Sequence, residues 1–452
     1  MKKIQQNELT SSLVATHWIA LSPLIVIIFA IISYLTTGDS STFGLLSNHT
    51  YFYLASFILL FLCFDLYPII IKERRFMRFK TTIKTRPELF ILLGFFVWNT
   101  IATLLQIGIF GKSDALASVI APLGIQEGFL IFFVYAMCVF FAFGIKNKAV
   151  MERILYIFLI SATTISILAL LDPNGNWIIQ STHNTPWASL FINSNHYGYF
   201  LTLATTLSAG ILVFAKEKWK QITFAVLTLF FCLISMFVDT FGSLIATFII
   251  FLALPFILWL TKKRFMAKSL LPIGLFVLSS FVAILFANTL NSTYKSFFTQ
   301  IINLVKEIFT IFEAPSSDEA MSAGTNRWSL WLNAIKSILA NPLIGNGDVL
   351  MRPHNEYLQY AVVWGIPSVI IYLSAFVVIA IKFIKHHKKL SNLSIILSLC
   401  VLCYLISAIF GNTMPHVVPF FALFLVFLII KLNDDITTPQ ETELAETKTE
   451  KL

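Results

Sequence analysis

The sequence predicts an all-α, polytopic membrane helix bundle with about twelve transmembrane helices, and two observations carry this prediction. Of the 452 residues, 57% are hydrophobic and only 12% are charged, with a mean hydropathy of +0.82. Soluble domains carry about 25% charged residues, so this composition is typical of a chain embedded in lipid. Apolar runs of about 18 residues or more also recur along the chain, whereas an outer-membrane barrel would show short alternating segments.

The expected spans follow one another with mostly short connections. They cover residues 17–36, 50–71, 89–111, 119–144, 154–172, 187–215, 221–239, 241–260, 269–288, 355–381, 392–410 and 417–431. The first run is long enough to span, and no small-residue cleavage site follows it, so we expect a retained helix. All five cysteines fall within predicted helices, where packing is the expected role and no disulfide framework is implied.

Basic residues gather in alternate connections. They occupy the N-terminus and the segments near 72–86, 146–153, 216–220, 262–268 and 382–389, whereas Lys112 is the clear basic residue on the other side before residue 289. Lys and Arg concentrate in cytoplasmic loops, so we expect both termini in the cytoplasm. The net charge of +9 is then a topology signal, and no nucleic acid partner is expected. One membrane domain over 1–432 should precede a disordered cytoplasmic tail over 433–452.

A large loop at residues 289–354, between the ninth and tenth expected spans, is predicted to lie outside the membrane. Its first half places apolar residues from Phe298 to Phe309 at helical spacing, which predicts an amphipathic helix on the membrane or on the bundle. A polar break, APSSDEAMSAGTN, should separate it from a second helix running from Arg327 to about Leu339 and closed by NPLIGNG. Loops of this length are uncommon without a function, so chemistry is expected here.

The densest group of charges expected outside the membrane contains Arg327, Arg352 and His354. Arginines facing outward oppose the inside-positive bias, so we expect them to bind an anion, because a guanidinium matches phosphate oxygens in bidentate fashion. An ion pair with Asp348 or Glu356, or contact with a lipid headgroup, is the alternative. His354 can exchange protons near neutral pH, and the alternative for it is a merely polar surface role.

Asparagines supply the other candidates for substrate contact. Asn355 stands at the head of an expected span, and the stretch FINSNHYGYFLTL brings Asn193, Asn195 and His196 to the start of another. Such amides can hold a substrate or cap a helix, and the sequence leaves both open.

Other polar residues are weaker candidates. Asp65 and Asp239 lie in expected spans, where acids are usually functional, and His49, His183 and His416 fall on the outer side. No HxxxH or HExxH spacing occurs, so no metal is expected. The chain also lacks a Walker A motif and a nucleotide-sugar domain. Any transfer reaction would therefore start from a substrate already activated in the membrane.

One stretch of the chain matches a known pattern. The residues R-W…NPLIGNG…RPHNEYLQ…WGIP…Y resemble the C-terminal signature of the O-antigen ligase and O-antigen polymerase superfamily. In that family an Arg opens a helix in the large outer loop, a P-x-x-G-x-G turn follows, and an H-N then heads the next membrane helix, before a Gly. The matching residues are Arg327, Pro342–Gly345–Gly347, His354–Asn355 and Gly365. The stretch at 191–195 also resembles the family's F-x-N-x-N.

The close resemblance covers residues 320–375, and the rest of the chain agrees in layout. Two positions depart from it. Where ligase-like members often carry Ser-Arg-Gly between two middle helices, this chain has Thr240–Phe241–Gly242, and where many carry Arg before Gly at an earlier outer helix, it has Gln126–Glu127–Gly128. Both departures remove a positive charge that would help to hold a diphosphate.

The resemblance implies a glycosyltransferase of the bacterial plasma or inner membrane that needs neither metal nor cofactor. It would transfer a polyprenyl-diphosphate-linked glycan en bloc to a hydroxyl of a glycan, lipid or protein acceptor at the outer face. Arg327 would hold the diphosphate and His354 would act as base. Substrate contacts would come from Arg352, Asn355, Asn193, Asn195 and His196. A polymerase that joins lipid-linked repeats remains an alternative, as does a flippase or secondary transporter.

Overall fold

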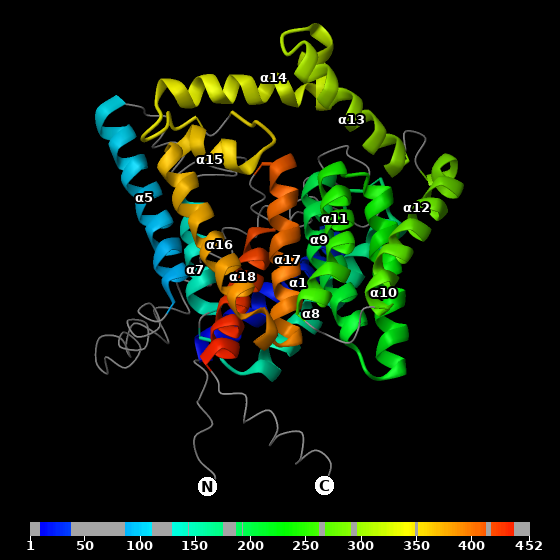
Figure 1. The fold of residues 1–452 in the computed structure, drawn as a ribbon. Helices are drawn as coiled ribbons and strands as arrows, with labels where there is room; N and C mark the ends of the chain where they lie inside the picture. Colours follow the sequence, from blue (N-terminus) through cyan, green and yellow to red (C-terminus); the bar gives the residue numbers. More distant parts are fainter. Residues whose placement is uncertain are drawn as a thin grey trace, which may run out of the picture.

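The computed structural model describes residues 10–37, 86–110, 129–142, 144–174, 187–191, 193–261, 267–290, 296–348, 351–412 and 417–437. Every regular element within these ranges is a helix (Figure 1). The expected all-α fold class is therefore confirmed for this part of the chain.

Eight helices in the described ranges are long and apolar enough to cross a membrane. They are α5 (Pro87–Phe110), α8 (Lys148–Leu171), α9 (Ser194–Phe214), α10 (Lys218–Val238), α11 (Phe241–Leu260), α12 (Leu271–Leu290) with η3 (Ala267–Leu270), α16 (Ile366–His386) with η4 (His387–Lys389), and α17 (Asn392–Ser407) with η5 (Ala408–Phe410). Three more helices, α1 (Thr10–Thr37), α7 (Phe129–Ala142) and α18 (Val418–Thr437), overlap expected spans. The expected span at 50–71 lies outside the described residues, so the total of twelve stays a prediction.

Helix α9 occupies the centre of the bundle, with α10, α11 and α17 packed around it. Its side chains are almost all buried, and many are small, including Thr202, Thr205 and Ser208. Small residues let helix backbones approach closely. At Gly198, for example, an added Cβ would lie 2.6 Å from the Cβ of Thr240, so only glycine allows α9 to meet the start of α11 here.

Two helices lie across one end of this bundle, hereafter the α14 end (Figure 1). They are α13 (Phe297–Glu313) and α14 (Asp318–Ala340), with the short α15 (Glu356–Trp364) beneath α14. The amphipathic helix expected from residue 298 onward is thus present as α13. Its apolar stripe is exposed, with Phe309 at 62% and Phe312 at 81% of their full accessible surface.

Three boundaries differ from expectation. Helix α14 begins at Asp318 and not at Arg327, because Ser317 caps it by accepting a hydrogen bond from the Ala320 N–H, 3.1 Å away, and acidic residues fill its first turn. The span expected over 355–381 is two helices, α15 and α16, separated at Gly365. Helix α18 continues past residue 432 to Thr437, so the beginning of the expected tail is helical.

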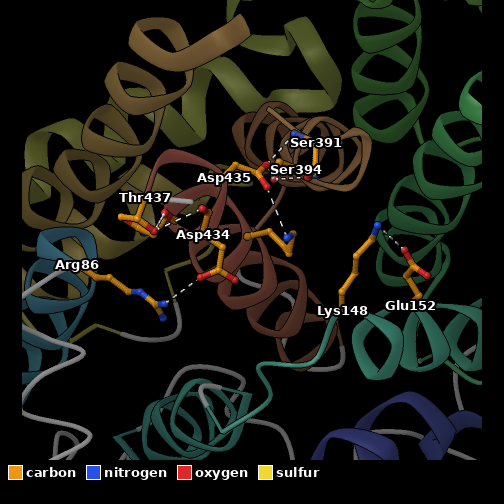
Figure 2. Close-up of polar contacts among 10 residues, drawn as sticks. Arg86, Lys148, Glu152, Ser391, Ser394, Asp434, Asp435 and Thr437 are labelled. Carbon is orange, nitrogen blue, oxygen red and sulfur yellow. Dashed lines mark hydrogen bonds and ion pairs between the residues drawn. The ribbon is translucent and has the colours of Figure 1, made fainter. Parts of the chain in front are cut away.

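The opposite end of the bundle, hereafter the Glu88 end, is tied together by charged side chains. Lys382 on α16 donates to Glu88 on α5 at 2.6 Å and to Asn433 on α18 at 2.9 Å, while Asn433 donates to the other Glu88 oxygen at 2.6 Å. Next to this group, Arg86 pairs with Asp434 at 3.7 Å (Figure 2). Three helices distant in sequence are therefore joined by one buried polar network.

A second set of contacts at the Glu88 end fixes the start of α17. Asp435 accepts hydrogen bonds from the Ser391 N–H at 2.7 Å and from the Ser394 hydroxyl at 2.5 Å (Figure 2). Lys431 approaches the same carboxylate to 3.5 Å. The end of α18 thus holds the α16–α17 connection in place.

Candidate functional site

Arg327 lies on α14, just after a local distortion of that helix. Gly324 and Asn326 have positive φ angles of 61° and 67°, and Glu307 on α13 accepts a hydrogen bond from the Gly324 N–H at 3.0 Å. A positive φ is rare for residues other than glycine, so this turn departs from regular helix geometry directly before Arg327. The distorted turn and the hydrogen bond to Glu307 together position the backbone from which the Arg327 side chain extends.

Among the described residues, none pairs with the Arg327 guanidinium. It is half-buried, and within the described part of the chain it makes neither a hydrogen bond nor an ion pair. Burial lowers the pKa of Arg327, whereas the nearby Tyr199 and Glu307 act to raise it. An unpaired, partly buried cation is unfavourable by itself, so the position is suited to an anionic ligand.

His354 lies close to Arg327, at the entry to α15. Its backbone is in the left-handed region, with φ at 52°, and its N–H donates to the side-chain oxygen of Asn412 at 2.8 Å. A left-handed histidine between the buried Pro353 and a helix cap is a strained arrangement of the kind found at functional sites. Because histidine does not favour this backbone conformation, the surrounding contacts must hold it and thereby position the imidazole.

The protonation state of His354 is set by burial and by two arginines. Burial lowers its pKa most, and the positive charges of Arg327 and Arg352 lower it further. A histidine with an ordinary pKa near 6.5 is already mostly neutral at pH 7, and this environment makes it more so. His354 is therefore available to accept a proton at neutral pH.

The turn NPLIGNG positions this group by docking on the junction between α15 and α16. The Asn346 N–H donates to the Val362 carbonyl at 2.9 Å, and the Ile366 N–H donates to the Pro342 carbonyl at 2.8 Å. At Gly365, where φ is 85°, an added Cβ would lie 2.1 Å from the Leu343 carbonyl oxygen.

Gly345 makes the matching close approach from the turn. Its φ is 70°, and an added Cβ would lie 2.5 Å from the Val363 carbonyl oxygen. Gly345 and Gly365 of the signature are thus required by close backbone contact between the turn and the α15–α16 junction.

Helix α5 satisfies the carbonyl groups that this junction leaves without helix partners. The Gln106 side-chain amide donates to the carbonyls of Ile344 at 2.5 Å and Val363 at 2.6 Å. The Trp98 indole donates to the Trp364 carbonyl at 3.0 Å. Buried carbonyls need such partners, so α5 stabilises the turn that carries the chain from Arg327 to His354.

No protein-family model matches this chain, and no curated protein matches it. The resemblance to the ligase and polymerase superfamily therefore rests on the residues quoted above.

Two of the expected substrate-binding asparagines cap helices. The Asn355 side-chain oxygen accepts from the N–H groups of Tyr357 and Leu358, both at 3.0 Å, at the start of α15. The Asn193 side-chain oxygen accepts from the His196 N–H at 3.1 Å at the start of α9. Each side-chain oxygen is thus committed to capping its helix.

The remaining expected contacts lie in different environments. His196 is buried at 3% exposure, whereas Asn195 and Arg352 are half-buried. Arg352, two residues before His354 in the sequence, lowers the pKa of that imidazole through its charge. At the α14 end, the charges of Arg327 and Arg352 both act on His354 and lower its pKa.

From the sequence, Glu356 was expected only as a possible ion-pair partner of the arginines. In the structure it is the most deeply buried acidic side chain described near the site. It is 1% exposed and accepts hydrogen bonds from the hydroxyls of Tyr360 at 2.7 Å, Tyr404 at 3.2 Å and Tyr372 at 3.4 Å. Burial raises the pKa of Glu356 to about 7, against the opposing effect of these three bonds. Tyr360 stands one turn after Glu356, which is a local signal, but Tyr372 and Tyr404 come from other helices.

Two other candidates have structural contacts. Asp239, left-handed with φ at 54°, ends α10 and accepts from the Gln300 amide of α13 at 2.6 Å. Phe241, where ligase-like members often carry Arg, packs its ring against Phe410 with centroids 6.1 Å apart. The candidates at Asp65, His49, His183, His416 and Gln126–Gly128 lie outside the described residues. In the described ranges, no group of three or more His, Cys, Asp or Glu side chains is placed to hold a metal.

Proposed function

We propose that this chain is a membrane glycosyltransferase of O-antigen ligase type. It transfers a glycan en bloc from a polyprenyl-diphosphate carrier to an acceptor hydroxyl. The observation that carries the proposal is the half-buried Arg327, which makes no ion pair with a described residue and whose charge lowers the pKa of His354. The order of these residues along the resembling stretch adds to it.

The donor half of the reaction suits Arg327. As the bond between the anomeric carbon and the diphosphate oxygen breaks, its electron pair leaves with the diphosphate. Negative charge therefore grows on the leaving group. A guanidinium held in a water-poor place stabilises that growing charge and can bond two oxygens at once. Arg352 supports it by adding positive charge nearby.

The acceptor half suits His354. The acceptor oxygen bonds to the anomeric carbon, and its proton passes to the neutral imidazole. The two neighbouring arginines keep the imidazole neutral before the reaction. After the transfer they favour release of the proton, since a third positive charge beside them is unfavourable. The pair of charges therefore resets the base between turnovers.

The direct test uses the purified full-length protein with polyprenyl-diphosphate glycans of defined length and an added acceptor. A single shift in acceptor mass supports the ligase reaction, and a ladder of donor lengths supports a polymerase. Movement of labelled donor across vesicles without any new glycosidic bond would replace the proposal by a flippase. Absence of both products and movement contradicts all three.

The membrane orientation is part of the proposal. We place the α14 end outside a bacterial plasma membrane and the Glu88 end, with both termini, in the cytoplasm. Ser316→Cys lies near the start of α14 and Lys389→Cys lies at the opposite end, and both positions are exposed. An impermeant thiol reagent on intact cells should label Ser316→Cys only. Labelling of Lys389→Cys alone would put the site in the wrong compartment.

A further inference from the structure

A cavity of about 490 Å³ opens at the Glu88 end, at the opposite end of the bundle from Arg327. Its walls come from the start of α8, the end of α9, the α9–α10 turn and the start of α17. Helix α9 packs closely on α17. The cavity lies beside that contact, between α17 and α8.

The polar rim of the cavity is rich in lysine. Lys148, Lys216 and Lys220 line it together with Glu152 and Glu217, which gives the lining one net positive charge. Lys220 pairs with Glu217 at 2.9 Å, and Lys148 approaches Glu152 to 3.9 Å (Figure 2). Lys216 is exposed and makes no ion pair within the described ranges. The rim therefore has positive charge left for an anion.

The deeper walls of the same cavity are apolar. They include Leu155 on α8, Leu207 and Ile211 on α9, and Ile396 on α17. A site with an apolar interior and a cationic rim matches an amphiphile whose charged group stays near water. Basic pockets between membrane helices on the cytoplasmic side bind anionic lipid headgroups in this way.

Aromatic side chains place the mouth of the cavity at the level of the membrane interface. Trp219, beside the rim, is 63% exposed, and the Lys220 Nζ lies 5.4 Å from its ring centroid. Tyr156 lines the cavity and is 40% exposed. Beyond Trp219, the outward face of α10 is apolar at Ile222 and Val226. Trp and Tyr concentrate where lipid headgroups meet acyl chains, so a lipid reaches this mouth more readily than a solute does.

We propose that this cavity binds one monoanionic phospholipid, with the phosphate at Lys148, Lys216 and Lys220 and an acyl chain along α9. The site is separate from the proposed glycan transfer and does not depend on it. Its expected role is to hold α8, α9 and α17 together at the headgroup level, because those three helices form its walls.

The test titrates the purified full-length protein in detergent with phosphatidylglycerol, and counts bound lipid by native mass spectrometry. Phosphatidylcholine with the same acyl chains and inorganic phosphate serve as competitors. One phosphatidylglycerol should bind in preference to phosphatidylcholine, and inorganic phosphate should not displace it. A lysine near a membrane surface contributes about 1 kcal/mol, which is about fivefold in affinity.

Replacing Lys148, Lys216 and Lys220 together by Gln should weaken phosphatidylglycerol binding at least about tenfold, given that two of these lysines also pair with glutamates. The matched control replaces the exposed Lys385, Lys388 and Lys389 by Gln, which removes equal charge at the same end and should leave binding unchanged.

A second variant, Ile211→Trp, fills the apolar part of the cavity without changing its charge and should abolish phosphatidylglycerol binding. Equal losses in both lysine variants, full binding in Ile211→Trp, no preference over phosphatidylcholine, or displacement by inorganic phosphate would each overturn the proposal.

Discussion

At the Glu88 end, Lys382 lies between a buried carboxylate and an asparagine, whereas at the α14 end Arg327 makes no ion pair with any described residue. The same contrast holds more widely. Within the described ranges, all five ion pairs with oxygen and nitrogen atoms inside 4.0 Å lie at the Glu88 end. The described charges at the Glu88 end form ion pairs with one another, whereas Arg327 at the α14 end forms none with a described residue.

The contrast separates two uses of charge in one bundle. A buried carboxylate paired with a lysine and an amide joins helices, and its charge is already compensated within the protein. An unpaired cation beside a histidine of lowered pKa retains its desolvation penalty until an anion arrives. The α14 end is therefore expected to respond to substitution through activity, and the Glu88 end through stability.

The largest expected effect is on turnover when the base is removed. His354→Ala should lower turnover about a hundred- to ten-thousand-fold, the range that positioned acid–base groups contribute, while donor binding is largely kept. His354→Gln is the matched variant, because glutamine can hydrogen-bond but cannot take the proton. Near-normal turnover in a stable His354→Gln protein would make His354 a structural residue and direct the search for a base to Glu356 or His196.

Arg327→Ala should lower turnover by about a hundredfold, by analogy with the loss of one donor to a developing oxyanion. Arg327→Lys keeps the charge but loses the two-pronged geometry, so it should remain impaired. Because the guanidinium has no partner in the described chain, thermal stability in detergent should not fall. A stable, fully active Arg327→Ala protein would contradict the assignment, and a destabilised one would contradict the contrast between the two ends.

Lys382→Met, in contrast to Arg327→Ala, should lower stability and not turnover per folded protein. It leaves the carboxylate of Glu88, whose side chain is fully buried, without its cation, and breaking such a pair typically destabilises by about 3–5 kcal/mol. The double variant Lys382→Met with Glu88→Gln removes both charges and should recover most of the loss. Thermal unfolding in detergent measures the stability of the single and the double variant, and activity is compared per folded protein. A double variant no more stable than Lys382→Met would show that the pair is not the cause.

The smallest expected effect is a shift in pH dependence. The Arg352 charge lowers the pKa of His354, so Arg352→Gln should raise that pKa. The base must be neutral to act, and activity is lost as pH falls through its pKa. The acidic limb of the pH–turnover profile should therefore move to higher pH in Arg352→Gln. Lys336→Gln, which removes an exposed charge of α14, should leave the limb in place. A limb that shifts equally in both variants would show a general charge effect.

Much of the bundle was predictable because its signals are local. Long apolar runs identify membrane helices, and a 3.6-residue period identified α13 as amphipathic. The start of α14 was missed because the Ser, Gly and Asn residues of 316–326 resemble a loop, although Ser317 followed by two acids is also a helix start. The division of α15 from α16 was missed because the residues on both sides of Gly365, from Tyr360 to Pro367, are apolar and carry no turn of polar residues.

By itself, the sequence determined that this chain forms apolar helices, where most of them begin and end, and which few polar residues stand beside the expected large loop. These properties depend on neighbours along the chain, so hydropathy and capping report them. The tertiary structure alone decided that Glu356 accepts hydrogen bonds from the hydroxyls of Tyr372 and Tyr404, that Gln106 of α5 supports the turn before His354, and that Arg327 makes no ion pair with a described residue. Burial, and the presence or absence of a charge partner, depend on helices far apart in sequence, which meet only when the bundle packs.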